Sequence, residues 1–200
     1  MEDNKNNKLI TFLTNCRRIL SCYFYQSLEL LAVKNYFFNR VLTQMRRIYY
    51  VKAVKIADVK STDKVLFIGS GILPSQCIII AEETGANVLG IDNSKKAVDL
   101  SIKYINKIGL SNKIYIKHGD GAKIPAKDFD AVFIAINVWP INNILNNLAK
   151  NLKKDARILY KSYNDDIYQI LENENLNNVF EVKERIVNPL SQSNLLIKKQ

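Results

Sequence analysis

A short loop containing two glycines is the first possible ligand site in this 200-residue sequence. Gly69, Ser70 and Gly71 follow the apolar run 65–68, and a helical pattern begins near Pro74. An uninterrupted apolar run is typical of a strand buried on both faces, and glycines at its end let a ligand approach the backbone. We therefore expect a strand–loop–helix unit whose loop contacts a small molecule, although a structural turn would need the same glycines.

Two acidic residues follow the next two strand-like runs. Asp92 comes 23 positions after Gly69, where a carboxylate can accept hydrogen bonds from two ribose hydroxyls. Asp120 follows the third run, where an ionised carboxylate can accept a hydrogen bond from the exocyclic amine of adenine. Asp92 could also favour the start of the next helix, and Asp120 with Gly121 could form a plain turn.

The loop disfavours a ligand with phosphates. Dinucleotide sites place a third glycine where this chain has Pro74, and the Gly-Lys-Ser/Thr sequence of the phosphate-binding loop is missing. A nucleoside without phosphates fits better, so a dehydrogenase is a weaker interpretation.

Helical and strand-like segments alternate after Asp63, which predicts βαβ units and a parallel sheet covered by helices on both faces. The last two runs enclose the turn-forming segment 188–193 and predict an antiparallel hairpin. We expect an α/β fold with a doubly wound, mostly parallel seven-stranded sheet. Its strands are 65–68, 88–91, 114–117, 131–135, 157–160, 179–187 and 194–199.

Ligands of such sheets bind at the carboxyl ends of the strands. These ends therefore define the candidate ligand-binding residues, which are Gly69, Ser70, Gly71, Asp92, Asn93, Asp120, Gly121, Ala135 and Ile136.

The first 60 residues have a helical pattern and predict a helical cap before a ligand-binding domain at 61–200. One helix is expected over 8–34, and a second carries an apolar stripe of Phe38, Val41, Leu42, Met45, Ile48 and Tyr49. Tyr49, Tyr50 and Glu29 are candidates for a catalytic base in this cap, and the tyrosines could instead form a packing face.

Composition narrows the class of protein. Lys and Arg exceed Asp and Glu by 29 to 19, but the charges are scattered, so a nucleic-acid partner is possible and not favoured. The three cysteines and the single His118 have no metal-ligand spacing, and we expect no metal. Without an apolar run long enough for a bilayer or a signal peptide, we expect a cytoplasmic protein. The oligomeric state stays open, and a homodimer is possible.

The motifs taken together resemble class I S-adenosylmethionine-dependent methyltransferases. The resemblance covers about 63–199 and rests on 65–71, 90–92, 119–120 and 129–133. It implies a Rossmann-like domain with S-adenosylmethionine as cofactor. The positions of Gly69 and Gly71 would line its amino-acid part, Asp92 would bind the ribose, and Asp120 would lie beside the adenine.

A narrower similarity is to nicotianamine synthases and their archaeal and bacterial relatives. It rests on the loop 67–75, on 157–162 and on 193–197, and Tyr49-Tyr50 resembles a tyrosine-rich stretch of that family. The similarity implies transfer of the aminocarboxypropyl group to an amine in place of methyl transfer.

Three functions follow as hypotheses. The first is transfer of a methyl or aminocarboxypropyl group from S-adenosylmethionine to a small-molecule acceptor. The second is an RNA methyltransferase, suggested by the net charge and by Arg17, Arg18, Arg40, Arg46 and Arg47. The third is a non-catalytic nucleoside-binding module.

Overall fold

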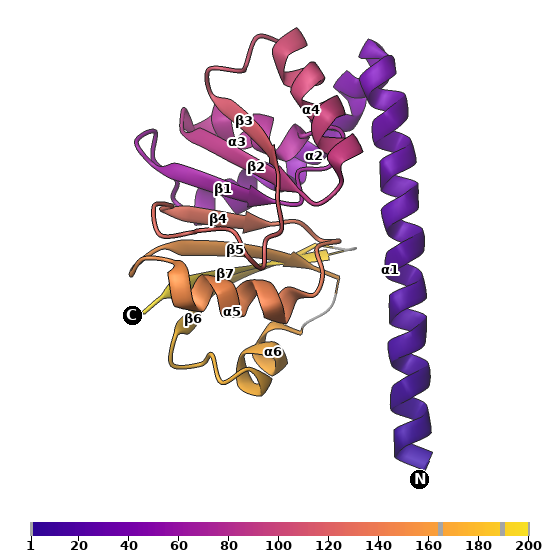
Figure 1. The fold of residues 1–200 in the computed structure, drawn as a ribbon, viewed down its shortest axis with the longest axis vertical. Coiled ribbons are helices and arrows are strands. Elements are labelled where there is room, and N and C mark those ends of the chain that lie inside the picture. Colours follow the sequence, from indigo (N-terminus) through magenta and orange to yellow (C-terminus); the bar gives the residue numbers. More distant parts are fainter. Residues whose placement is uncertain (1, 164–165, 189–190, 200) are drawn as a thin grey trace.

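The computed structural model contains one mixed sheet of seven strands, in the order β3-β2-β1-β4-β5-β7-β6 (Figure 1). It describes residues 2–163, 166–188 and 191–199, without the side chains of 2–15, 17, 18 and 36. The strands are β1 (Lys64–Ile68), β2 (Asn87–Asp92), β3 (Ile114–His118), β4 (Ala131–Ile134), β5 (Arg157–Ser162), β6 (Phe180–Asn188) and β7 (Ser191–Lys198).

Strands β1 to β5 are parallel, and β7 pairs antiparallel with both β5 and β6. The predicted doubly wound sheet with an antiparallel hairpin is therefore confirmed. The connection between the two hairpin strands is shorter than predicted, because β6 extends to Asn188 and β7 begins at Ser191. The predicted turn residues Pro189 and Leu190 lie outside the described residues.

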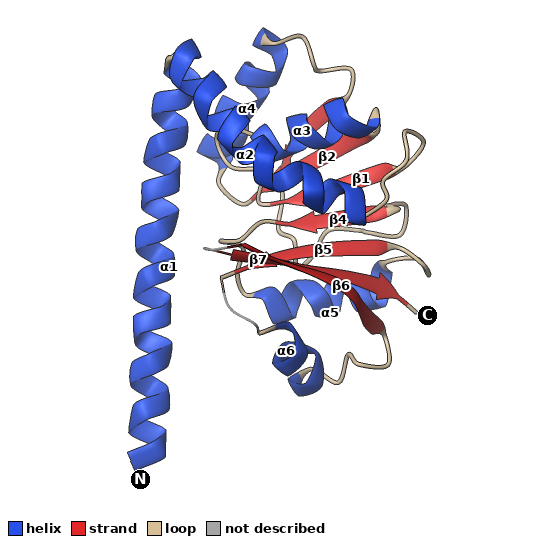
Figure 2. Ribbon diagram, turned by 180° about the vertical axis from the view of Figure 1, so that it is seen from behind, coloured by secondary structure: helices blue, strands red, loops and turns tan. Residues whose placement is uncertain are grey.

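Helices cover both faces of the sheet (Figures 1 and 2). Helices α2 (Tyr36–Ile56), α3 (Ser75–Thr84) and α4 (Lys95–Lys107) pack on one face, around a core that includes Phe67 and Phe133. Helices α5 (Ile141–Asn151) and α6 (Ile167–Asn173) pack on the other face. The short α6 was not predicted, since its seven residues give too little periodicity to be recognised.

The N-terminal segment consists of two helices, α1 (Glu2–Lys34) and α2, as predicted. Asn35 separates them and caps α2, because its side-chain oxygen accepts a hydrogen bond from the backbone N–H of Phe38. The predicted apolar stripe of α2 lies largely on the exposed side, where Ile48 is 74% exposed and Met45 57%. The buried side of α2 presents mainly small residues and one aromatic ring to the sheet: Tyr50, Ala53, Val54 and Ala57.

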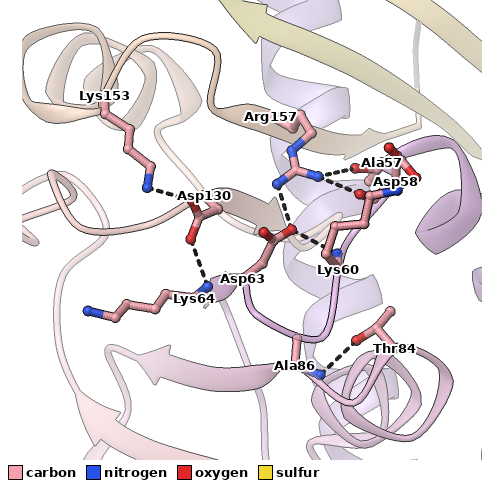
Figure 3. A network of polar contacts seen from close by, with 10 residues as sticks. All are labelled: Ala57, Asp58, Lys60, Asp63, Lys64, Thr84, Ala86, Asp130, Lys153 and Arg157. Carbon is pink, nitrogen blue, oxygen red and sulfur yellow. Dashed lines mark hydrogen bonds and ion pairs between the residues drawn. The ribbon is translucent and has the colours of Figure 1, made fainter.

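The loop between α2 and β1 is fastened at the amino edge of the sheet (Figure 3). The Arg157 guanidinium donates to the backbone oxygens of Ala57 and Asp58 and pairs with Asp63 at 2.6 Å. At the same edge, the backbone N–H of Lys64 donates to the Asp130 carboxylate. The predicted division near residue 60 falls in this loop, although α2 shares the core of the following domain.

Candidate functional site

The loop after β1 has the backbone conformation that requires glycine. Gly69 has φ = +88° and Gly71 φ = +70°, a region that side-chain-bearing residues rarely adopt. A Cβ on Gly69 would lie 2.4 Å from Val138, and one on Gly71 would lie 2.7 Å from Glu29 Oε2. The buried Ser70 lies between them. The loop is thus closely packed between the segment after β4 and helix α1.

Asp92 contacts this loop directly. Its Oδ2 accepts a hydrogen bond from the backbone N–H of Gly71 at 2.9 Å, and its Oδ1 accepts one from Ser94 N–H at 2.9 Å. The alternative role predicted for Asp92 is present, because Asp92 orders the start of α4, where the Ser94 hydroxyl oxygen caps Ala97 N–H. The carboxylate is only partly buried, so it can accept further hydrogen bonds from a ligand.

Glu29, on α1, supplies a second carboxylate to the same loop. Its Oε2 accepts hydrogen bonds from the backbone N–H groups of Ile72 (2.9 Å) and Leu73 (3.3 Å), and its Oε1 pairs with Arg46 Nη2 at 2.9 Å. Arg46 also donates to Ser75 Oγ. Burial raises the pKa of Glu29 above its ordinary value, against the opposing effects of Arg46 and the two backbone hydrogen bonds.

These contacts explain which ligands the loop suits. A bound pyrophosphate needs free backbone N–H groups at the N-terminus of the following helix. Here the N–H groups of Ile72 and Leu73 are taken by Glu29, that of Gly71 is taken by Asp92, and Pro74 has none. Two carboxylates at this position would also repel phosphates. The chemistry of the loop therefore fits a nucleoside that carries hydroxyls and positive charge, as S-adenosylmethionine does.

The remaining predicted ligand residues lie along the carboxyl edge. Asp120 is exposed, and its Oδ1 accepts from Ala122 N–H, while Gly121 is buried against Ile68. The other three are the exposed Asn93, whose carbonyl oxygen is 3.0 Å from His118 Nε2, and the half-buried Ala135 and Ile136. The sheet order places these residues after neighbouring strands, as the prediction requires.

The two predicted catalytic tyrosines lie in different surroundings. Tyr49 is 54% exposed, whereas Tyr50 is 6% exposed. The Tyr50 ring packs beside Phe67 and Phe133, and burial raises the pKa of its hydroxyl well above the ordinary value. Tyr50 is therefore protonated at neutral pH and unsuited to act as a base. Of the three base candidates, the structure brings Glu29 to the glycine loop.

Helix α1 runs past the carboxyl ends of the strands (Figure 1). Glu29 contacts the loop after β1, and eight residues earlier the Ser21 hydroxyl is 2.5 Å from the hydroxyl of Tyr163, which follows β5. Tyr163 in turn donates to Asn137 Oδ1 in the segment after β4. Tyr25 lies four residues from both Ser21 and Glu29 and so on the same side of the helix. The ends of β1, β4 and β5 are thus bridged by one helix.

Sequence reasoning attached no role to Ser21, Tyr25, Lys161 or Tyr163. Lys161 belongs to β5 and lies on the same face as Tyr50, with its Nζ 6.0 Å from the centroid of that ring. A lysine directly after the apolar run 158–160 is the one signal that could have indicated it.

The described residues also bear on metal binding and on RNA binding. Within the described residues, no group of three or more His, Cys, Asp or Glu side chains could hold a metal ion. Of the arginines that suggested RNA binding, Arg46 pairs with Glu29, and Arg47 pairs with Glu82 and Glu83. Arg17 and Arg18 have side chains outside the described residues.

None of the described helices has the length and apolar character needed to cross a membrane.

Comparison with known proteins gives a match over nearly the whole chain. The family model described as "Nicotianamine synthase protein" matches residues 14–197. A demethylmenaquinone methyltransferase of Lactobacillus johnsonii is 33% identical over 116 residues, which are 54% of this chain and 46% of that protein. An L-histidine 2-aminobutanoyltransferase of Pseudomonas aeruginosa is 24% identical over 106 residues, 52% of this chain and 40% of that protein. The matched segments thus span about half the length of these curated relatives.

Solved structures share the fold. A crystal structure of an MtNAS variant in complex with S-adenosylmethionine has a TM-score of 0.75 at 19% identity, covering 92% of this chain and 76% of that one. An RNA methyltransferase from Salinibacter ruber, in complex with S-adenosyl-L-homocysteine, has a TM-score of 0.62 at 16% identity, covering 76% of this chain and 92% of that one.

Proposed function

The chain belongs to the nicotianamine synthase family, and we propose that it transfers the aminocarboxypropyl group of S-adenosylmethionine to the amine of a small molecule. The observation that carries this proposal is the Glu29 carboxylate, buried against the glycine loop where the reacting amine would need a base. The amino-acid acceptor named for the Pseudomonas aeruginosa relative supports an amine as the nucleophile.

Each part of S-adenosylmethionine has a proposed binding residue. Asp92 would hold the ribose hydroxyls, and Asp120 would accept from the adenine amine. Gly69 and Gly71 would line the amino-acid part, and both positions require glycine because a Cβ would collide with Val138 or Glu29. Ser70, Asn93, Gly121, Ala135 and Ile136 complete the proposed cofactor site. We also retain a cytoplasmic location as a prediction.

When bound, S-adenosylmethionine supplies a carbon that is already activated by the neighbouring sulfonium. Glu29 would accept a proton of the acceptor amine, whose nitrogen would then bond to that carbon. The same displacement would break the carbon–sulfur bond, leave its electron pair on sulfur and release methylthioadenosine. Because the leaving group is good, positioning by α1 and the loop would supply most of the acceleration. The raised pKa of Glu29 makes it a stronger base than an exposed glutamate.

Methyl transfer is the second candidate, and the similarity to the Lactobacillus johnsonii methyltransferase favours it. The same cofactor residues would serve both reactions, because each is a displacement at a carbon bonded to the sulfonium. The products differ, since methyl transfer leaves S-adenosylhomocysteine and aminocarboxypropyl transfer leaves methylthioadenosine.

Product identification tests the proposal. The purified protein is incubated with S-adenosylmethionine and a set of amines that includes L-histidine, and nucleoside products are measured by mass spectrometry. Formation of methylthioadenosine only when an acceptor is present supports the proposal. Formation of S-adenosylhomocysteine would contradict it and indicate methyl transfer. Glu29→Gln should lower the rate by about 10²-fold or more, whereas the exposed control Glu172→Gln should not change it.

A further inference from the structure

Lys161 lies in the same row of the sheet as the glycine loop. Phe67, Phe133 and Leu159 are register partners across β1, β4 and β5. Two residues further along the chain come Gly69 and Ala135, directly after β1 and β4, and Lys161, which is still in β5 and on the same face as Leu159. Neighbouring strands are about 4.8 Å apart, so Lys161 begins about 10 Å from Gly69. Asp92 and Asp120 lie on the other side of β1, after β2 and β3.

Among the described residues, the Lys161 amine has no anionic partner. Its Nζ makes no hydrogen bond or ion pair with a described residue, and it lies over the face of the Tyr50 ring, 6.0 Å from the ring centroid. Burial lowers the pKa of this amine, and the positive charge of Arg46 acts in the same direction. Cations in such surroundings are ordinarily paired.

The charges near Lys161 do not balance. The Glu29 carboxylate is already shared between Arg46 and the N–H groups of Ile72 and Leu73. Counting the described residues alone, one positive charge is therefore left without a counterion on the β5 side of the edge. Ser21 and Tyr163, which fasten α1 above the ends of β4 and β5, are neutral.

We propose that Lys161 binds a carboxylate of the acceptor and so selects amino acids over simple amines. This inference rests on the proposed function. A ligand whose adenine and ribose lie at Asp120 and Asp92 brings its sulfonium toward β1 and β4, and the acceptor then approaches from β5. A carboxylate held by Lys161 fixes the acceptor and leaves its amine free to approach Glu29.

The test compares Lys161→Gln with Lys161→Arg and with Lys150→Gln, an exposed lysine of α5, as the control. Acceptors are the twenty amino acids, each paired with its decarboxylated amine, for example L-histidine with histamine. Wild-type protein should use an amino acid in preference to its amine. Lys161→Gln should raise the KM for that amino acid about tenfold or more and leave the KM for the amine unchanged. Lys161→Arg should recover part of the loss, and Lys150→Gln should match the wild type.

Several outcomes would overturn the inference. Wild type that uses no amino acid, or uses amines equally well, would do so, as would an unchanged KM in Lys161→Gln. If Lys161→Gln lost affinity for S-adenosylmethionine and kept it for methylthioadenosine, the lysine would hold the carboxylate of the cofactor instead. Failure of the proposed function looks different, because wild type would then release no methylthioadenosine with any acceptor.

Discussion

The ion pair between Arg46 and Glu29 gives a quantitative prediction. In Arg46→Met, the Glu29 carboxylate keeps two backbone hydrogen bonds and loses its cationic partner in a position where the two side chains are only 14% and 11% exposed. Breaking a buried pair costs about 3–5 kcal/mol, and the residual exposure places this one near 3 kcal/mol. For a chain of this size, that lowers the unfolding midpoint by about 6–12 °C.

The loss of stability should depend on pH. Burial raises the pKa of Glu29, and removal of Arg46 raises it further. A folded-state pKa above the unfolded value gives a contribution that is fully present below the unfolded pKa and lost as pH rises through the folded one. The deficit of Arg46→Met should therefore be small near the ordinary pKa of 4.5 and grow toward pH 8.

Urea unfolding at pH 5 and pH 8 measures this difference. Arg47→Met is the matched control, because Arg47 is the next residue of α2 and pairs with Glu82 and Glu83 on a more exposed surface. Its cost should be about 0–1 kcal/mol. The double variant Arg46→Met with Glu29→Gln should recover part of the loss, since no charge then stays unpaired. An equal deficit at both pH values, or additive effects of the two substitutions, would refute the reasoning.

Two of the three further predictions concern the cofactor site, and the third concerns the base and the acceptor site. Gly71→Ala should lower the affinity for S-adenosylmethionine about tenfold or more, measured by calorimetry, because its Cβ would lie 2.7 Å from Glu29. The control is Gly109→Ala, because Gly109 has φ = +73° and open space around it. This control should show only the loss of stability that the left-handed backbone causes, about 1–2 kcal/mol. Asp92→Asn should weaken binding of S-adenosylmethionine and methylthioadenosine alike by about tenfold, and an unchanged dissociation constant would remove the ribose assignment. The pH profile of kcat/KM should rise as Glu29 loses its proton above 4.5 and fall as Lys161 loses its proton below 10.5; a profile flat across this range would contradict both roles.

The sheet and the glycine loop could be predicted because their signals are local. An apolar run followed by Gly69-Ser70-Gly71 gives the strand and the turn within a few residues, and Asp92 followed by Ser94 marks the start of α4 in the same way. The order of parallel strands then places their ends together.

The sequence named Glu29 as one of three base candidates but could not single it out, because the acceptor side depends on contacts between distant segments. Glu29 meets a loop 43 residues later, and no periodicity in α1 reveals this. The apolar stripe of α2 predicted the wrong side of the helix to be buried. Small residues such as Ala53 pack closely on the sheet, while Ile48 stays exposed. For the same reason, the sequence could not distinguish the buried Tyr50 from the exposed Tyr49.

The central claim is tested most directly by calorimetry of the purified protein with S-adenosylmethionine, methylthioadenosine and S-adenosylhomocysteine, with NAD as the control. We predict that S-adenosylmethionine binds, that methylthioadenosine binds more tightly than S-adenosylhomocysteine, and that NAD does not bind. A preference for S-adenosylhomocysteine would indicate methyl transfer, and the absence of binding by all three nucleosides would contradict the account.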